Sequence, residues 1–354
     1  MRISILLPLL PPERPSGGYR VHLEYANRLA RRGHCVSVIF PETVPLPPPD
    51  AIRTTTSPSP FLAERLWWFT IDDGVRLLVV PDLRRGSLPP ADVVMLTSWA
   101  TAEAALDYPP ATGRKVYVVY DYEYWRSVDA DVRQRMSRTF QLDAEVVATS
   151  VAVEEMLAEN GVRPAATIPC GLDFETFHIK QPIAGRHPLR VGLPLRDEPF
   201  KGTADGLAAL EEVRRHAGPT LQAVAFGASH RSGVPPWVDV LGRPTDAALC
   251  DLFNSLSILV LPSLYEGWGL PGCEAMACGA ALVTTDSVGV RGYARDGETA
   301  IVVPPGQPLL LAGAVLDLLA DDTRRQRLAT AGSAFVERFT WEAAVTQLEQ
   351  VMIG

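Results

Sequence analysis

The chain has 354 residues, of which 47% are hydrophobic and 21% charged, and its formal net charge is −8. This length accommodates two domains of ordinary size, and the composition is that of a folded globular protein rather than a disordered one. The negative charge is spread over both halves, so no basic half is present to bind nucleic acid or an anionic membrane. Membrane association stays possible but is not supported by charge, and no run approaches the ~18 apolar residues of a membrane-spanning helix.

The amino terminus and the cysteines bear on location. Ile3 to Leu7 predicts a first strand, because this apolar run is too short for a signal peptide and lacks a small-residue cleavage site. Five cysteines with irregular spacing favour reduced thiols and a cytoplasmic protein. Neither they nor the six histidines fall into a zinc pattern.

A strand, loop, helix and strand follow in the first forty residues. Gly17 and Gly18 end a proline-rich loop, and apolar residues at helical spacing over residues 19–33 predict a helix that ends at Gly33. Residues 35–40 read as the second strand. The glycine pair lies at a helix N-terminus, a position that attracts phosphate. The alternative is that the two glycines only form a turn.

The rest of the first half alternates strands with loops. Residues 41–60 are predicted to form a loop or lid, and strands are predicted at 75–80, 93–96, 116–120 and 145–150. The aromatic cluster at 66–69 is either part of the core, a platform for a bound ligand or a membrane contact. Asp121 and Glu123 follow a strand and are either ligand-contacting residues or polar loop ends.

The second half repeats the alternation. Strands are predicted at 189–193, 221–226, 238–241, 258–261 and 281–284, with helices at 203–216 and 245–254. This pattern is typical of a doubly wound α/β domain. The stretch 181–188 carries proline and glycine and predicts a boundary, giving domains 1–180 and 186–338.

One glycine-rich loop and short helix, residues 262–279, lies between two predicted parallel strands. Gly267, Gly269 and Gly272 allow close approach of a ligand, and the following helix offers unpaired N–H groups to phosphate. Glu266 and Glu274 flank this turn at the carboxyl end of a strand, where open sheets bind ligands. Carboxylates there accept sugar hydroxyl groups well; the alternative is that both are solvated.

This segment closely resembles the signature of the retaining glycosyltransferases of family 4, "S-x-x-E-G-x-G-L-x-x-x-E-A-M-A-x-G", and the resemblance continues through residues 302–306. It implies the GT-B fold, an α/β architecture of two doubly wound Rossmann-like domains facing a central cleft. The nucleotide would lie mainly on the second domain and the acceptor on the first. Residues 339–354, which begin with an "F-x-W" pattern, would form a closing helix that packs on the first domain.

The resemblance also assigns roles to residues. Glu266 would contact the transferred sugar and Glu274 the ribose, while Arg196 and Lys201 would hold the leaving diphosphate, on which charge grows as the glycosidic bond breaks. Asp121 remains a candidate for orienting the acceptor. The other donor-binding candidates are Gly17, Gly18, Tyr120, Gly267, Trp268, Gly269 and Leu270. Tyr120 stands where many relatives have a histidine, so that histidine's role does not carry over.

The implied activity is transfer of a sugar, with retention, from a nucleotide-diphosphate sugar to a hydroxyl of a polysaccharide, glycolipid or natural product. The implied mechanism is a front-face reaction that needs no metal or other cofactor. Two alternatives stay open: a GT-B isomerase of the UDP-GlcNAc 2-epimerase kind, and a catalytically silent nucleotide-sugar-binding protein.

Overall fold

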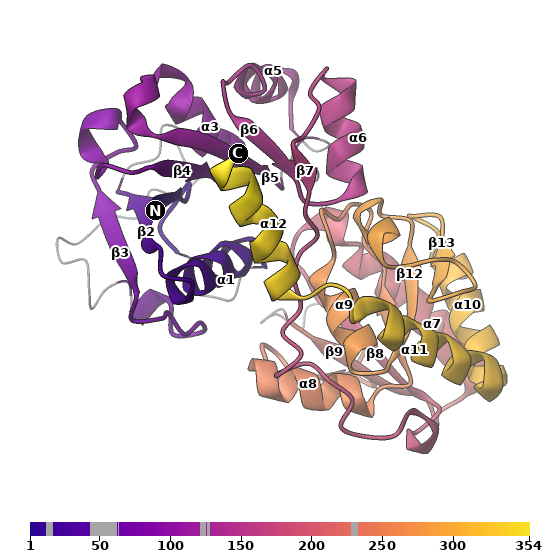
Figure 1. Cartoon of the computed structure of the whole chain (residues 1–354). Helices are drawn as coiled ribbons and strands as arrows, with labels where there is room; N and C mark the ends of the chain where they lie inside the picture. The colour runs from indigo at the N-terminus through magenta and orange to yellow at the C-terminus, as the bar shows by residue number, and fades with distance from the viewer. Residues whose placement is uncertain (12–16, 43–61, 63, 121–124, 126–127, 228–232) are drawn as a thin grey trace. The chain divides into compact units, whose positions relative to one another are not determined.

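The computed structural model describes residues 1–354 except 12–16, 43–61, 63, 121–124, 126–127 and 228–232 (Figure 1). The chain forms two compact units. Unit 1 comprises Met1–Gly171 and Trp341–Gly354, and unit 2 comprises Leu172–Thr340. The boundary lies earlier than the predicted 180–186, because the intervening segment packs on unit 2. The Phe177 ring lies 6.2 Å from the Phe253 ring.

Unit 1 contains a seven-stranded parallel sheet in the order β3-β2-β1-β4-β5-β6-β7. Its strands are β1 (Arg2–Leu6), β2 (Cys35–Pro41), β3 (Val75–Val80), β4 (Val93–Leu96), β5 (Arg114–Val119), β6 (Glu145–Ala148) and β7 (Ala166–Thr167). Its described α-helices are α1 (Gly17–Arg31), α3 (Trp99–Ala104), α5 (Ala130–Thr139), α6 (Val151–Glu159) and α12 (Trp341–Ile353). The strand order reverses between β1 and β4, the type of position at which open α/β sheets bind ligands.

Helix α12 ends the chain but packs on unit 1, beside α1 (Figure 1). The Trp341 ring meets the Tyr25 ring edge to face at 5.6 Å, and the Arg28 guanidinium lies 5.3 Å from the Trp341 ring centre. Glu349 on α12 accepts hydrogen bonds from Arg32 and from His34 Nε2, the latter at 2.7 Å. Aromatic packing and a charged cluster therefore both hold the helix in place.

The Glu349 cluster makes the stability of unit 1 depend on pH. Burial raises the pKa of Glu349, but hydrogen bonds from His34 and Arg32 outweigh it and hold the pKa below the usual 4.5. A lowered folded-state pKa stabilises above the unfolded-state pKa, and this contribution is lost as pH falls through the folded-state value. We expect Glu349→Gln to lower the Tm by about 2–4 °C at pH 7 and progressively less below pH ~4. Thermal unfolding of the wild type and the variant at pH 7 and below pH ~4 checks this. An equal loss of Tm under the two conditions would contradict the prediction.

Unit 2 contains a six-stranded parallel sheet in the order β10-β9-β8-β11-β12-β13. Its strands are β8 (Arg190–Pro194), β9 (Gln222–Phe226), β10 (Asp239–Val240), β11 (Ile258–Leu261), β12 (Ala281–Thr285) and β13 (Ile301–Val303). Its described α-helices are α7 (Thr203–Ala217), α8 (Asp246–Ser255), α9 (Leu270–Ala277), α10 (Pro308–Ala320) and α11 (Asp322–Val336). The order reverses between β8 and β11, so right-handed crossovers through α7 and α9 cover opposite faces of the sheet.

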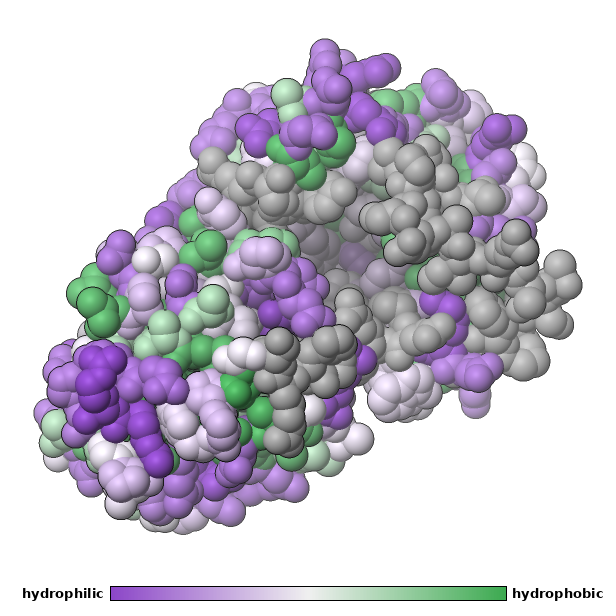
Figure 2. Space-filling view, turned by 180° about the vertical axis from the view of Figure 1, so that it is seen from behind, coloured by the Kyte–Doolittle hydropathy of each residue, from purple (hydrophilic) through white to green (hydrophobic). Residues whose placement is uncertain are grey.

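The surface mixes polar and apolar residues. On the face in Figure 2, hydrophilic residues are interspersed with small hydrophobic patches. The predicted aromatic cluster at 66–69 divides between core and surface, because Leu66 is buried whereas Trp67 is 63% exposed. Among the described helices, none combines the length and apolar character that crossing a bilayer requires.

Candidate functional site

The loop 262–269 leads from the buried strand β11 into α9. Gly269, with a φ of 86°, precedes the first helical residue, and Pro271 lies in the first turn. A Cβ on Gly269 would lie 2.7 Å from the Tyr293 hydroxyl oxygen, and this hydroxyl donates to the Gly269 carbonyl at 2.8 Å. Only glycine therefore fits the turn, which Tyr293 fixes in place.

Glu266 is buried in this loop, with 7% of its surface exposed. Its carboxylate accepts a hydrogen bond from Ser263 Oγ at 2.7 Å and forms an ion pair with Lys201 Nζ at 2.8 Å. Glu274, on α9, is 9% exposed. The alternative that these carboxylates are solvated surface groups is therefore wrong.

The glycine after Lys201 allows the lysine segment to lie directly against the loop that carries Glu266. The short 3-10 helix Pro199–Lys201 ends at Gly202, whose φ is 66°. A Cβ on Gly202 would lie 2.0 Å from the Pro262 carbonyl oxygen. The Phe200 carbonyl also accepts the Leu264 N–H at 2.7 Å. Backbone contact thus joins the lysine segment to the loop that carries Glu266.

Arg196 follows β8, the neighbour of β11 in the sheet. Thr203 Oγ1 accepts the Arg196 N–H at 3.0 Å and donates to its carbonyl at 2.8 Å, which fixes the main chain. The half-buried guanidinium donates to the Leu195 carbonyl at 3.0 Å and lies over Gly227, where a Cβ would be 1.9 Å from Nη1. Arg196 and Glu266 therefore follow the carboxyl ends of adjacent strands.

Trp268 differs from its neighbours in the loop, because its side chain belongs to the core. It is 5% exposed and packs against the rings of Tyr293 at 5.5 Å and Phe339 at 5.1 Å. Its Nε1 has no hydrogen-bond partner among the residues that the structure describes. The Trp268 ring is thus taken up by core packing, and the donor-binding role predicted for Trp268, Gly267, Gly269 and Leu270 stays a prediction.

The candidates in unit 1 lie at α1 and after β5. Gly17 and Gly18 are the exposed first residues of α1, and no described atom lies within 4 Å of a Cβ built on Gly18. Tyr120 follows β5 and is half-buried; burial raises its pKa well above the usual 10, with Tyr25 and Cys170 adding to the rise. Asp121 lies outside the described residues.

Two polar residues that contact predicted site residues, His22 and Ser263, are assigned no role from the sequence. His22, on α1, contacts the Tyr120 ring edge to face at 5.0 Å, and burial lowers its pKa to about 3. Nothing in the sequence distinguishes this histidine from an ordinary helix residue. Ser263, which binds the Glu266 carboxylate, does have a signal, because the S-x-x-E spacing allows a loop hydroxyl to reach that carboxylate.

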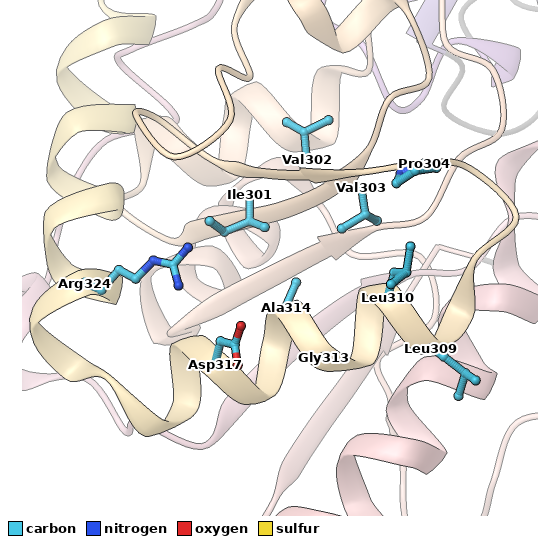
Figure 3. Close-up of a pocket in the computed structure, with 10 residues that line it drawn as sticks. All are labelled: Ile301, Val302, Val303, Pro304, Leu309, Leu310, Gly313, Ala314, Asp317 and Arg324. Carbon is cyan, nitrogen blue, oxygen red and sulfur yellow. The ribbon is translucent and has the colours of Figure 1, made fainter.

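A pocket of about 330 Å³ lies between β13, α10 and α11 (Figure 3). Its wall is mostly apolar, with Asp317 and Arg324 at one end. The lining residues are Ile301, Val302, Val303, Pro304, Leu309, Leu310, Gly313, Ala314, Asp317 and Arg324. None of the predicted site residues is among them.

Comparison with known proteins gives matches in both units. The family described as "Glycosyl transferases group 1" matches residues 201–335, and "Glycosyltransferase Family 4" matches residues 15–176. The O-antigen biosynthesis protein RfbC of Myxococcus xanthus is 30% identical over 285 residues, which cover 75% of this chain and 21% of that protein. The phosphatidyl-myo-inositol mannosyltransferase of Mycobacterium tuberculosis is 32% identical over 204 residues, 53% of each chain. The matches thus span about a fifth and about half of these relatives.

Among solved structures, that of Anabaena HepE in complex with UDP-glucose aligns over 99% of both chains. The TM-score is 0.76 at 18% sequence identity, a likeness that establishes the fold. The predicted GT-B architecture of two doubly wound Rossmann-like domains is confirmed. Because family matches cover both units and the glutamate motif stands at the carboxyl end of β11, this chain belongs to glycosyltransferase family 4.

Proposed function

We propose that this protein transfers a sugar from a nucleotide-diphosphate sugar to a hydroxyl acceptor, with retention of anomeric configuration and without a divalent metal. The observation that carries the proposal is the buried Glu266 carboxylate, bound by Lys201 and Ser263 beside the N-terminus of α9. A fixed anion, a fixed cation and a helix N-terminus at one strand end suit a ligand that combines hydroxyl groups with phosphates.

The residues divide the donor between them. Lys201 and Arg196 would bind the diphosphate and offset the charge that grows on it as the glycosidic bond breaks. The first turn of α9 adds N–H groups and the positive end of the helix dipole. Glu274 would accept ribose hydroxyl groups, and Glu266 would accept a hydroxyl of the transferred sugar. Gly17 and Gly18, at the start of α1, stay candidates for binding phosphate.

The chemistry needs no base from the protein. The bond between the anomeric carbon and the diphosphate oxygen breaks, and a bond to the acceptor oxygen forms on the same face. The acceptor proton passes to an oxygen of the leaving diphosphate. Catalysis then consists of positioning and electrostatic stabilisation. The Lys201–Glu266 ion pair suits this role, because it fixes the positions of both charged groups before the reaction.

Relatives suggest the substrate class. HepE has been crystallised with UDP-glucose, and two relatives are named for O-antigen biosynthesis and for mannosyl transfer to phosphatidyl-myo-inositol. These names support a nucleotide-diphosphate hexose as donor and a carbohydrate or glycolipid as acceptor. The described residues contain no cluster of three or more metal-ligating side chains, and independence from metal remains a prediction.

A titration of the purified protein with UDP, GDP, dTDP and ADP tests the proposal. We expect one nucleotide to bind at least ~10-fold more tightly than the others, with the same Kd in magnesium and in chelator. Glu274→Gln should weaken that binding roughly 10-fold through loss of the ribose contact. Glu298→Gln is the matched control, because the Glu298 side chain lies in the same unit and is 70% exposed. This change should leave the nucleotide Kd unaltered.

Failure of all four nucleotides to bind would contradict the phosphate site. Binding that disappears with chelator would contradict metal independence alone. A bound nucleotide sugar that is neither transferred nor isomerised would favour the silent binding protein over the transferase.

A further inference from the structure

The segment between Asp286 and Arg291, next to the site, contains an unusual turn. Val288 has φ 65° and ψ −56°, and it is the only residue other than glycine with a positive φ in the described part of the chain. The Gly289 N–H donates to the Ser287 carbonyl at 2.8 Å, which closes a γ-turn around Val288. This form of γ-turn is rare and strained, and a β-branched residue fits it badly.

Several contacts hold Val288 in this conformation. Its N–H donates to the Asp286 carboxylate, and its carbonyl accepts the Arg291 N–H at 3.0 Å. The Arg291 guanidinium binds both Asp286 carboxylate oxygens, at 2.7 and 2.8 Å. A strained residue persists only where its surroundings over-determine it, and such residues cluster at functional sites. The Asp286–Arg291 ion pair meets that condition by clamping both sides of the turn.

The turn rests directly on the main chain of Glu266. The Ser287 carbonyl, which closes the γ-turn, also accepts the Glu266 N–H at 3.0 Å, and Val288 forms an isolated parallel bridge with Glu266. A Cβ on Gly289 would lie 2.2 Å from the Glu266 carbonyl oxygen. No room is left between the turn and the loop, so a change in the turn must move Glu266.

We propose that Val288 is a positioning residue for Glu266. Its strained turn aims the Ser287 carbonyl at the Glu266 N–H and so fixes where the carboxylate meets the transferred sugar. Valine at a positive φ has one narrow well, whereas glycine there would have several. The strain is retained because rigidity at this point serves transfer. This inference rests on the proposed role of Glu266 and adds a residue that the glutamate motif does not contain.

The variant Val288→Gly separates positioning from packing. Glycine adopts the turn without strain but does not lock it. We expect the Tm to stay within ~2 °C of the wild type or to rise by about 2–4 °C, because relief of strain offsets the added freedom of the unfolded chain. We expect nucleotide Kd to change less than ~3-fold and kcat for transfer to fall about 10-fold or more. If Val288 has a structural role only, kcat will stay at the wild-type value whatever the change in Tm.

A second variant and a control accompany it. Arg291→Met opens the clamp from outside the turn and should also lower kcat about 10-fold at unchanged nucleotide Kd. Gly297→Ala adds a Cβ at φ 71° where no described atom lies within 4 Å. It should lower Tm by ~1–3 °C and leave kcat unchanged. This control shows the effect of backbone strain at a position that does not contact Glu266.

Wild-type kcat in both Val288→Gly and Arg291→Met would overturn the inference, provided that Glu266→Gln abolishes transfer. If Glu266→Gln itself transfers normally, the proposed function of Glu266 fails instead. Should Val288→Gly not fold, the rigid turn is a stability element, and Arg291→Met alone decides whether it also positions Glu266.

Discussion

Replacing Glu266 with glutamine is expected to lower the rate of sugar transfer at least ~100-fold while nucleotide affinity changes less than ~3-fold. Glutamine has nearly the same shape, so the Ser263 hydroxyl can still donate to the side-chain oxygen. It has no charge, so the ion pair with Lys201 Nζ, now 2.8 Å long, is lost. The transferred sugar loses a charged acceptor, whereas the nucleotide keeps Glu274 and α9.

Kinetics and nucleotide titration on the same preparation check this prediction. Glu298→Gln serves again as the exposed control and should transfer at the wild-type rate. Loss of nucleotide binding in Glu266→Gln would show that the ion pair holds unit 2 together rather than serving the sugar. Wild-type transfer would remove Glu266 from the site.

Replacing Arg186 with methionine is expected to produce the largest loss of stability. Arg186 is 8% exposed, and burial lowers the pKa of its guanidinium. It donates to oxygens at the C-terminal ends of α8 and α9 and to the carbonyl of Gln181, which precedes both helices in the chain. These acceptors are the carbonyls of Gln181 (3.1 Å), Phe253 (3.3 Å), Leu256 (3.2 Å) and Cys278 (2.5 Å) and the Asn254 side-chain oxygen (3.5 Å).

Methionine fills a similar volume but satisfies none of these acceptors, which would remain buried. We expect a loss of about 3–5 kcal/mol and a Tm lower by roughly 8–15 °C, because each unpaired buried carbonyl costs free energy. Arg215→Met is the matched control. The Arg215 side chain is 67% exposed and pairs with Glu212 on the surface of α7, so its loss should lower Tm by less than ~2 °C. Equal effects of the two changes would contradict the structural role of Arg186.

The sequence predicts local features of this molecule better than tertiary ones. The helix expected at 203–216 is α7, Thr203–Ala217, because helical periodicity and the preceding glycine are both local signals. The strand and helix around Glu266 follow the same logic. The boundary at Gly171 is different, since the residues after it join unit 2 through contacts with distant α8 that no local pattern shows.

The features of the site likewise divide into those that local motifs predict and those that depend on distant contacts. Glu266, Glu274, Arg196 and Lys201 are identified from motifs and remain predictions as to role. The strain at Val288 could not be predicted, because it arises from contact with Glu266, 22 positions earlier, and from the clamp by Arg291. The burial of the Trp268 ring likewise depends on Phe339, far along the chain.

The division of unit 1 between Met1–Gly171 and Trp341–Gly354 has a consequence during synthesis. The ribosome completes every residue of unit 2 before it makes α12. Unit 2 can therefore close its core while the Tyr25 ring and the Arg32 and His34 side chains still lack their partners on the last helix. The amino-terminal unit, although made first, acquires its final packing last.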